Sequence, residues 1–204
     1  YGNGPSRVTR KARSHDVVVL TGQRKRFFRE GSLPGRNPHM RGTSSLLRLL
    51  FGRQVGTNYD GEFVRLNGEA VHIFELFALG NFLLCSAISA GQGMAGSKRG
   101  QSTATMRRNC GAHFGQMLRI LQPTVVIAQG PGVRRWMDPL VEVIGSVSAN
   151  VERAKVGSSA FLLASFTHPS VPSRDNWGTD ARRPYLLGVV APTVRDLHRE
   201  VLGR

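Results

Sequence analysis

The chain has 204 residues, which is enough for one domain that buries about 70% of the surface its unfolded form exposes. Its two cysteines, Cys85 and Cys110, are too few for a disulfide framework, a four-cysteine zinc site or an iron–sulfur cluster, so we expect buried thiols in a reducing compartment. The formal charge of +15, from 28 Lys and Arg against 13 Asp and Glu, indicates a polyanionic partner.

The positive charge is concentrated near the start of the chain. Residues 1–60 carry 12 basic and 3 acidic side chains, which accounts for nine of the fifteen surplus charges. Residues 1–15 are polar and basic, and we expect a flexible arm that is either a disordered terminus or a phosphate-contacting segment. No apolar run of about 18 residues and no long amphipathic basic helix is present, which favours nucleic acid over a membrane as the partner. Residues 16–204 are expected to form a single domain.

The first expected strand is the β-branched run at residues 16–22, of the kind buried in parallel sheets. Residues 22–42 then form a long connection rich in Arg, Lys, Gly and Pro. Connections of this length are usually functional, and the alternative is a solvated basic loop. Thr43 or Ser44 is expected to cap a helix that Gly52 ends.

The middle of the chain contains a second expected strand and a long helix. Residues 56–68 are turn-like, and residues 70–79 are apolar enough for a short helix or an irregular segment. Residues 81–89 form an apolar strand, and the glycine-rich loop that follows matches neither common phosphate-binding motif, so no nucleotide cofactor is expected. Residues 103–121 place apolar side chains at helical spacing and predict a helix that faces the core.

The last third predicts two further central strands. Residues 123–130 form a strand that turns at Gly-Pro-Gly into a short helix around Trp136, and residues 140–157 hold a weaker edge strand and a turn. Residues 161–170 form an apolar strand that stops abruptly at a His-Pro-Ser corner, and residues 185–202 have a helical period that a proline divides or starts. This alternation predicts an α/β fold, in which three layers (α/β/α) contain a central, mostly parallel four-stranded sheet.

Four pieces, in this order, resemble the uracil-DNA glycosylase superfamily: VVVLTGQ at 17–23, NFLLCSAIS at 81–89, LQPTVVIAQG at 121–130 and FTHPS at 166–170. The resemblance is one of pattern and order over residues 16–200. It implies an enzyme that rotates a base out of the DNA stack and cleaves its glycosidic bond without a metal or other cofactor.

The resemblance also implies roles for the His-Pro-Ser corner. His168 would stabilise the charge that builds on the base carbonyl, Ser170 would hold a phosphate, and Val171 or a neighbour would fill the emptied stack. Two places depart from the family. Gln23 stands where members carry a carboxylate that positions water, and Ser86 aligns with a base-reading Asn.

Substitutes for the two altered positions are available nearby. Glu30 and Asp60 lie on neighbouring segments of the sequence and are candidates for the missing carboxylate, although a charged loop residue is usually only solvated. Asn81 falls at the start of the second expected strand and is a candidate for reading the base. The hydroxyl of Ser86 in place of an amide leaves room for a bulkier base, which favours a modified pyrimidine over plain uracil.

We therefore expect a monomeric, cytoplasmic DNA glycosylase that acts in base-excision repair or in defence against modified foreign DNA. A non-catalytic DNA-binding module on the same scaffold is the main alternative, and an α/β enzyme acting on RNA or nucleotides is a weaker one. The expected catalytic residues are His168, Gln23 and Glu30. The expected base-binding residues are Gly22, Phe28, Met40, Ser86 and Asn81. The expected DNA-contacting residues are Arg24, Lys25, Arg26, Arg36, Arg41, Lys98, Arg99, Ser170, Val171 and Arg174.

Overall fold

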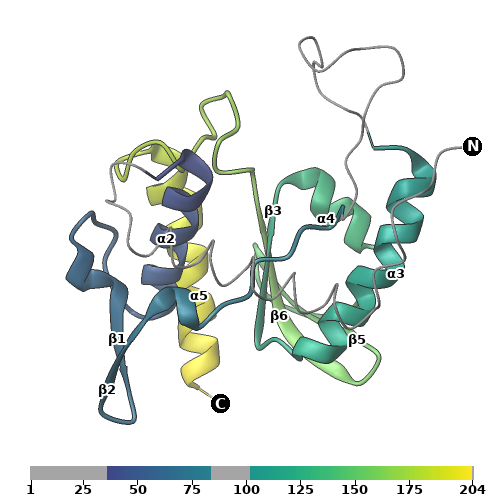
Figure 1. The fold of residues 1–204 in the computed structure, drawn as a ribbon, viewed down its shortest axis with the longest axis horizontal. Helices are drawn as coiled ribbons and strands as arrows, with labels where there is room; N and C mark the ends of the chain where they lie inside the picture. Colours follow the sequence, from purple (N-terminus) through teal and green to yellow (C-terminus); the bar gives the residue numbers. More distant parts are fainter. Residues whose placement is uncertain (1–35, 84–101, 204) are drawn as a thin grey trace, which may run out of the picture.

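The computed structural model describes residues 36–83 and 102–203 (Figure 1). The strand predicted at residues 16–22, most of the basic connection and the second expected strand beyond Leu83 lie outside the described residues. Within them, helices lie on either side of a four-stranded sheet, and a small two-stranded hairpin stands apart from that sheet (Figure 1).

The four-stranded sheet is mixed. Its strands are β3 (Val125–Gln129), β4 (Glu142–Ser148), β5 (Val151–Val156) and β6 (Ser159–Phe166), in the order β3-β6-β5-β4. Strands β3 and β6 are parallel, whereas β5 is antiparallel to both of its neighbours. Short turns join β4 to β5 and β5 to β6, and such turns can connect only antiparallel strands.

The expected α/β class is thus confirmed, but two finer expectations are not. The sequence predicted a mostly parallel sheet, but of the three strand pairings that the described residues make in the four-stranded sheet only the one between β3 and β6 is parallel. Residues 140–157 were expected to hold one weak edge strand and a turn; β4 is an edge strand, but the same residues also form β5. The glycosylase-like three-layer arrangement stays a prediction.

The helices of the second half follow the expected pattern. Helix α3 (Ala104–Leu121) begins after Thr103, whose hydroxyl accepts a hydrogen bond from the backbone of Met106 at 3.1 Å. Its buried face includes Cys110, as expected for a core thiol, whereas Cys85 lies outside the described residues. Helix α4 (Pro131–Met137) follows β3 directly. The π-helical turn η4 (Leu186–Val190) leads into α5 (Ala191–Leu202), which has a proline in its first turn.

Helix α2 (Pro38–Leu50) is longer than predicted. The sequence analysis placed its start at Thr43 or Ser44, but Asn37 is the cap, because its side-chain oxygen accepts a hydrogen bond from the backbone of Met40 at 2.9 Å. A proline directly after such a cap suits the first helical position, where no backbone donor is needed. The predicted end is confirmed, since Gly52 adopts a φ of +72° just beyond the helix.

A β-hairpin occupies the region predicted as turn and irregular segment. Strands β1 (Phe63–Leu66) and β2 (Glu69–His72) pair through a tight turn in which Asn67 and Gly68 both have positive φ values. The 3-10 turns η2 (Tyr59–Glu62) and η3 (Ile73–Glu75) flank the hairpin. The Asn-Gly pair is a strong hairpin signal, and the sequence analysis did not use it.

Strand β6 lies at the centre of the core. Leu162, Ala164 and Phe166 pack with residues of α2, η4 and α5, while Phe161 and Leu163 pack with residues of α3 and α4. This alternation is what a strand buried on both faces requires. A third cluster, which includes residues of α2 and the hairpin, joins these two elements. Strand β6 is thereby packed on both faces, and the His-Pro-Ser corner follows its carboxyl end.

Candidate active site

The carboxyl ends of the parallel strands β3 and β6 meet at one edge of the sheet. Gln129 and Phe166 are register partners there, and the backbone N–H of Gly130 donates to the carbonyl of Phe166 at 2.7 Å. Gly130 has a φ of +123°, and a Cβ built on it would lie 4.0 Å from the Cβ of His168. The His168 side chain therefore lies at the sheet edge where open α/β folds bind their ligands.

Ser170 fixes the hydrogen-bonding state of His168. The backbone N–H of Ser170 donates to His168 Nδ1 at 3.3 Å, and the Ser170 hydroxyl lies 2.9 Å from the same nitrogen. A backbone N–H can only donate, so Nδ1 is an acceptor and the proton of the neutral ring is assigned to Nε2. His168 is exposed, and its Nε2–H is accordingly the group that this ring offers to a ligand.

A second histidine, His39, stacks on His168. The two ring centroids are 5.0 Å apart and the rings are inclined by 16°. His39 lies in the first turn of α2, so two segments far apart in the sequence supply the pair. Burial of part of the His168 ring and the positive charge of protonated His39 lower the pKa of His168 below the ordinary value for histidine. The neutral form of His168 is favoured as a result.

A closed set of hydrogen bonds holds His39. Its Nε2 lies 2.7 Å from Gln129 Oε1, and Gln129 Nε2 donates to the Thr43 hydroxyl at 3.2 Å. The Thr43 hydroxyl donates in turn to the carbonyl of His39 at 3.0 Å. With these directions, His39 Nε2 is a donor to Gln129. The bonds connect the start of α2 to the end of β3.

The loop at residues 167–180 is fastened at several points. Trp177 is buried, and its indole N–H donates to the carbonyl of Thr167 at 2.7 Å. The Thr167 hydroxyl donates to the carbonyl of Asp175 at 2.8 Å, and Asn176 donates to the carbonyl of Val171 at 3.0 Å. These contacts hold both sides of the loop, so His168 stands on a supported backbone.

Two glycines let α2 approach this loop closely. A Cβ on Gly178 would lie 1.8 Å from the carbonyl oxygen of Pro38, and a Cβ on Gly42 would lie 2.7 Å from the Cβ of Pro169. No side chain fits at either distance without movement of the backbone or of Pro169. The close packing of α2 on the loop is what allows His39 to stack on His168.

The corner places three predicted DNA-contacting residues near His168 in sequence and on the same loop. Ser170 is exposed and hydrogen-bonded to the His168 ring. The backbone N–H of half-buried Val171 donates to the carbonyl of His168 at 3.0 Å. The Arg174 side chain is 96% exposed, with Asp175 3.9 Å away. The contacts of these three residues with DNA stay predictions.

Three other predicted residues have structural roles instead. Met40 was expected to bind the base, but it is buried in the cluster that joins α2 to the hairpin. Arg36 was expected to contact DNA, but it is buried and forms a two-bond ion pair with Glu62 at 2.6 and 2.9 Å. Arg41 is half-buried and donates to the carbonyls of Arg36 and Thr179, both at 2.9 Å. Composition marked these side chains as basic or apolar, but only the fold shows what they touch.

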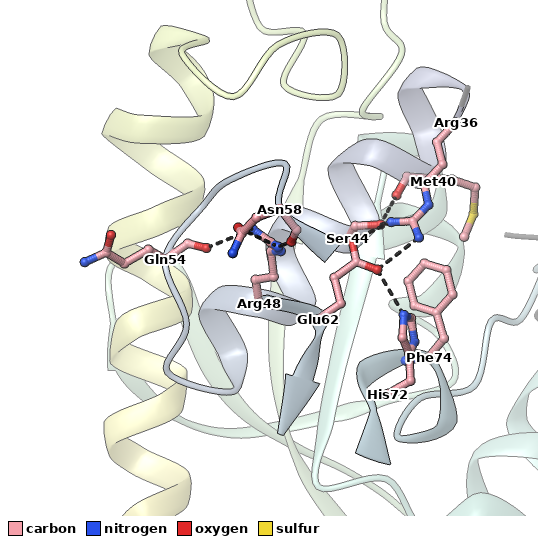
Figure 2. A network of polar contacts seen from close by, with 9 residues as sticks. All are labelled: Arg36, Met40, Ser44, Arg48, Gln54, Asn58, Glu62, His72 and Phe74. Carbon is pink, nitrogen blue, oxygen red and sulfur yellow. Dashed lines mark hydrogen bonds and ion pairs between the residues drawn. The ribbon is translucent and has the colours of Figure 1, made fainter. Parts of the chain in front are cut away.

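The ion pair belongs to a buried polar cluster between α2 and the hairpin (Figure 2). Glu62 accepts hydrogen bonds from Arg36 and from His72 Nε2 at 3.0 Å, and the Arg36 guanidinium lies 4.9 Å from the centre of the Phe74 ring. Burial raises the pKa of Glu62, but the hydrogen bonds from His72 and Arg36 outweigh burial and the pKa lies below its usual value. Each charged group here has a partner, which is what a buried charge requires.

The remaining predicted residues are not gathered at the corner. Asp60 lies exposed in η2, and Asn81 lies exposed beside Gly80, where a Cβ would meet the side chain of Met117 on α3. Neither is among the described contacts of His168 or His39. The other predicted site residues lie outside the described residues, namely Gly22, Gln23, Arg24, Lys25, Arg26, Phe28, Glu30, Ser86, Lys98 and Arg99.

The sequence analysis counted His39 among the side chains of the basic connection that could meet a nucleic acid, but it did not predict the stacking of His39 on His168, and it missed Gln129 and Thr43 as members of the site. The available signals were weak: a histidine just after an Asn-Pro helix start, and a polar residue at the end of an apolar strand. Within residues 36–83 and 102–203, no three His, Cys, Asp or Glu side chains are grouped so as to hold a metal ion. Over the same residues, no helix has the length and apolar character needed to cross a bilayer.

Comparisons with known proteins add no relative to this description. No family model, no curated protein and no solved structure matches the chain. The protein is a mixed α/β protein in which two stacked histidines lie at the carboxyl edge of the parallel strands β3 and β6.

Proposed function

We propose that this protein is a DNA glycosylase that rotates a damaged or modified base out of the DNA and cleaves its glycosidic bond. The observation that carries the proposal is the hydrogen-bonding state of His168 and its position at the sheet edge. Its Nδ1 accepts from the Ser170 backbone, its neutral form is favoured, and it stands on a fastened loop after β6. A neutral imidazole that presents Nε2–H is suited to hold a developing oxyanion without transferring a proton.

In the proposed reaction, the bond between the sugar C1′ and the base nitrogen breaks, and its electron pair leaves with the base. The negative charge spreads onto a base carbonyl oxygen, where His168 Nε2–H donates a hydrogen bond. Water then adds to C1′, and the proton that it loses neutralises the departed base anion, which leaves an abasic site and the free base. Gln23 and Glu30 stay the candidates for orienting that water.

Two further features support a nucleic-acid substrate. The charge of +15 favours binding to phosphates, and exposed Ser170 and Arg174 lie on the same loop as His168. The order of the sequence motifs resembles that of the uracil-DNA glycosylase superfamily. The proposal therefore includes the three-layer α/β/α arrangement of that superfamily. Ser86, in place of a base-reading amide, directs the proposal toward a modified pyrimidine.

The test is to incubate the protein with DNAs that carry uracil, hypoxanthine or modified cytosines, including phage DNA with modified bases. Alkali-labile abasic sites are then measured in the wild type and in His168→Ala. We expect sites on at least one substrate and at least a 100-fold loss in His168→Ala, with DNA affinity nearly unchanged, because one preorganised donor to an oxyanion contributes about that factor. Absence of sites on every DNA would refute the proposal.

A non-catalytic DNA-binding module is the second candidate. The observation that favours it is that, among the described residues, no hydrogen bond or ion pair joins an Asp or Glu side chain to the ring of His168 or His39. Under this reading, His168→Ala leaves every DNA-dependent property intact. The same pair of proteins therefore separates the two functions.

A further inference from the structure

The two stacked rings each have one nitrogen already engaged. Nε2 of His39 faces Gln129 Oε1, and Nδ1 of His168 accepts from Ser170. Protonation of His39 therefore adds a proton to its Nδ1, and protonation of His168 adds a proton to its Nδ1 at the cost of the hydrogen bond from the Ser170 backbone N–H. Two imidazolium charges with ring centroids 5.0 Å apart repel each other, so the protonation of one ring opposes that of the other.

We propose that His39 is a positioning residue for His168, supporting its ring face to face and, when protonated, holding it in the neutral form that presents Nε2–H. The inference deepens the proposed function and rests on it only for the catalytic consequence. The structural basis is the closed set of hydrogen bonds through Gln129 and Thr43. These bonds fix the orientation of the His39 ring, so that the His168 ring stacks against it in one orientation.

His39 is the charged neighbour that acts on His168 among the described residues. Charged groups on the surrounding elements have other partners. On α2, Arg41 donates to two backbone carbonyls. On α4, Arg134 pairs with Asp138 and with Glu152 at 2.8 Å. On the loop, Arg174 lies near Asp175. Gln129 on β3 has no ionisable group, and the hydroxyl of Tyr185 accepts from the backbone of Thr167.

Two substitutions separate the charge of His39 from its shape. His39→Phe keeps a flat ring against His168 and removes the charge, whereas His39→Gln removes both the ring and the charge but keeps a donor for Gln129. The measurement is an NMR pH titration of the His168 imidazole signal, identified by its loss in His168→Ala. His113→Gln is the matched control, because His113 is an exposed histidine on α3.

We expect the titration midpoint of His168 to move to higher pH in both His39 variants and to stay unchanged in His113→Gln. Above neutral pH, His39→Phe should form product at the wild-type rate, and the fall in rate on the acidic side should begin at a higher pH than in the wild type. His39→Gln should form product more slowly than the wild type at every pH. An unchanged His168 midpoint in the folded variants overturns the inference, and either variant suffices if the other does not fold. If the proposed glycosylase function is wrong, the wild type will produce no abasic sites. The NMR titration of His168 can still be measured in that case, so the two failures are distinguishable.

Discussion

At the residue scale, the protein places histidines in two different surroundings. His168 is exposed at the sheet edge beside His39, and the pKa of His168 is lowered. His72 is buried in the hairpin, where Nδ1 accepts from the backbone of Phe74 at 3.1 Å and Nε2 faces Glu62. The first ring has a nitrogen available to a ligand, whereas both nitrogens of the second have partners within the protein. This contrast separates a candidate site from a structural cluster.

The buried cluster should be tested through Glu62. Glu62→Gln removes the negative charge but leaves Arg36 and His72 buried, and we expect a loss of about 3 kcal/mol in the free energy of unfolding, measured with urea at pH 7. The matched control is Glu69→Gln, because Glu69 is exposed on β2. An equal, small effect for both variants would contradict the structural role of the cluster.

The destabilisation caused by Glu62→Gln should depend on pH. The pKa of Glu62 is lowered by folding, so below the ordinary pKa of glutamate the unfolded state binds the proton that the native state excludes. The stabilisation from the ionised carboxylate is therefore present above the unfolded-state pKa and is lost as pH falls through the native one. The stability difference between wild type and Glu62→Gln should narrow as the pH is lowered, and a constant difference would contradict this prediction.

At the scale of elements, the site depends on the packing of α2 against the loop at residues 167–180. The loop supplies His168, α2 supplies His39, and β3 supplies Gln129. The contact between loop and helix is close because glycines stand at Gly42 and Gly178. A small movement of α2 would separate the two histidine rings without any change in the site residues themselves.

We predict that Gly178→Ala disturbs this contact. The new methyl group would meet the carbonyl oxygen of Pro38, so we expect a loss of about 3 kcal/mol in stability and weaker coupling between the histidine titrations. Gly115→Ala is the matched control. Gly115 lies inside α3 with nothing within 4 Å of an added Cβ, and alanine there should stabilise the helix by about 0.5–1 kcal/mol. Thermal unfolding of both variants measures the difference, and equal stability would contradict the packing argument.

At the scale of the whole molecule, the total charge of +15 does not say which cationic side chains a partner can reach. Arg36, Arg41 and Arg48 are directed into the protein, where they bind side chains and backbone carbonyls. Arg174 extends into solvent on the loop that carries His168. The position of each cation, and not the total charge alone, decides which residues can meet phosphate.

We therefore predict unequal effects from two arginines. Arg174→Ala should weaken DNA binding several-fold and lower the salt dependence of log K by about one unit. Arg119→Ala is the control, because Arg119 lies near Gly157, in the turn before β6 and thus at the opposite end of that strand from His168. Binding measured by fluorescence anisotropy at several salt concentrations gives both slopes. Equal slopes would show that the DNA does not approach the His168 loop.

The sequence by itself determined the elements whose signal is local. The period of apolar residues defined α3 and α5, short apolar runs defined β3 and β6, and the His-Pro-Ser corner marked the end of β6. The Asn-Pro start of α2 and the Asn-Gly turn of the hairpin are local signals of the same kind. The sequence analysis did not use them, so it placed the start of α2 too late and missed the hairpin. Capping and turn chemistry act over a few residues, which is why such features can be found without a fold.

Only the tertiary structure decided which side chains meet. His39 lies 129 positions before His168, and Arg36 finds Glu62 through the packing of α2 on the hairpin. Burial then assigned Met40 and Arg36 to the interior, although their residue types fitted a binding surface equally well. Contacts between distant segments depend on how elements pack, and packing depends on the shapes of many side chains at once, which no short sequence pattern contains.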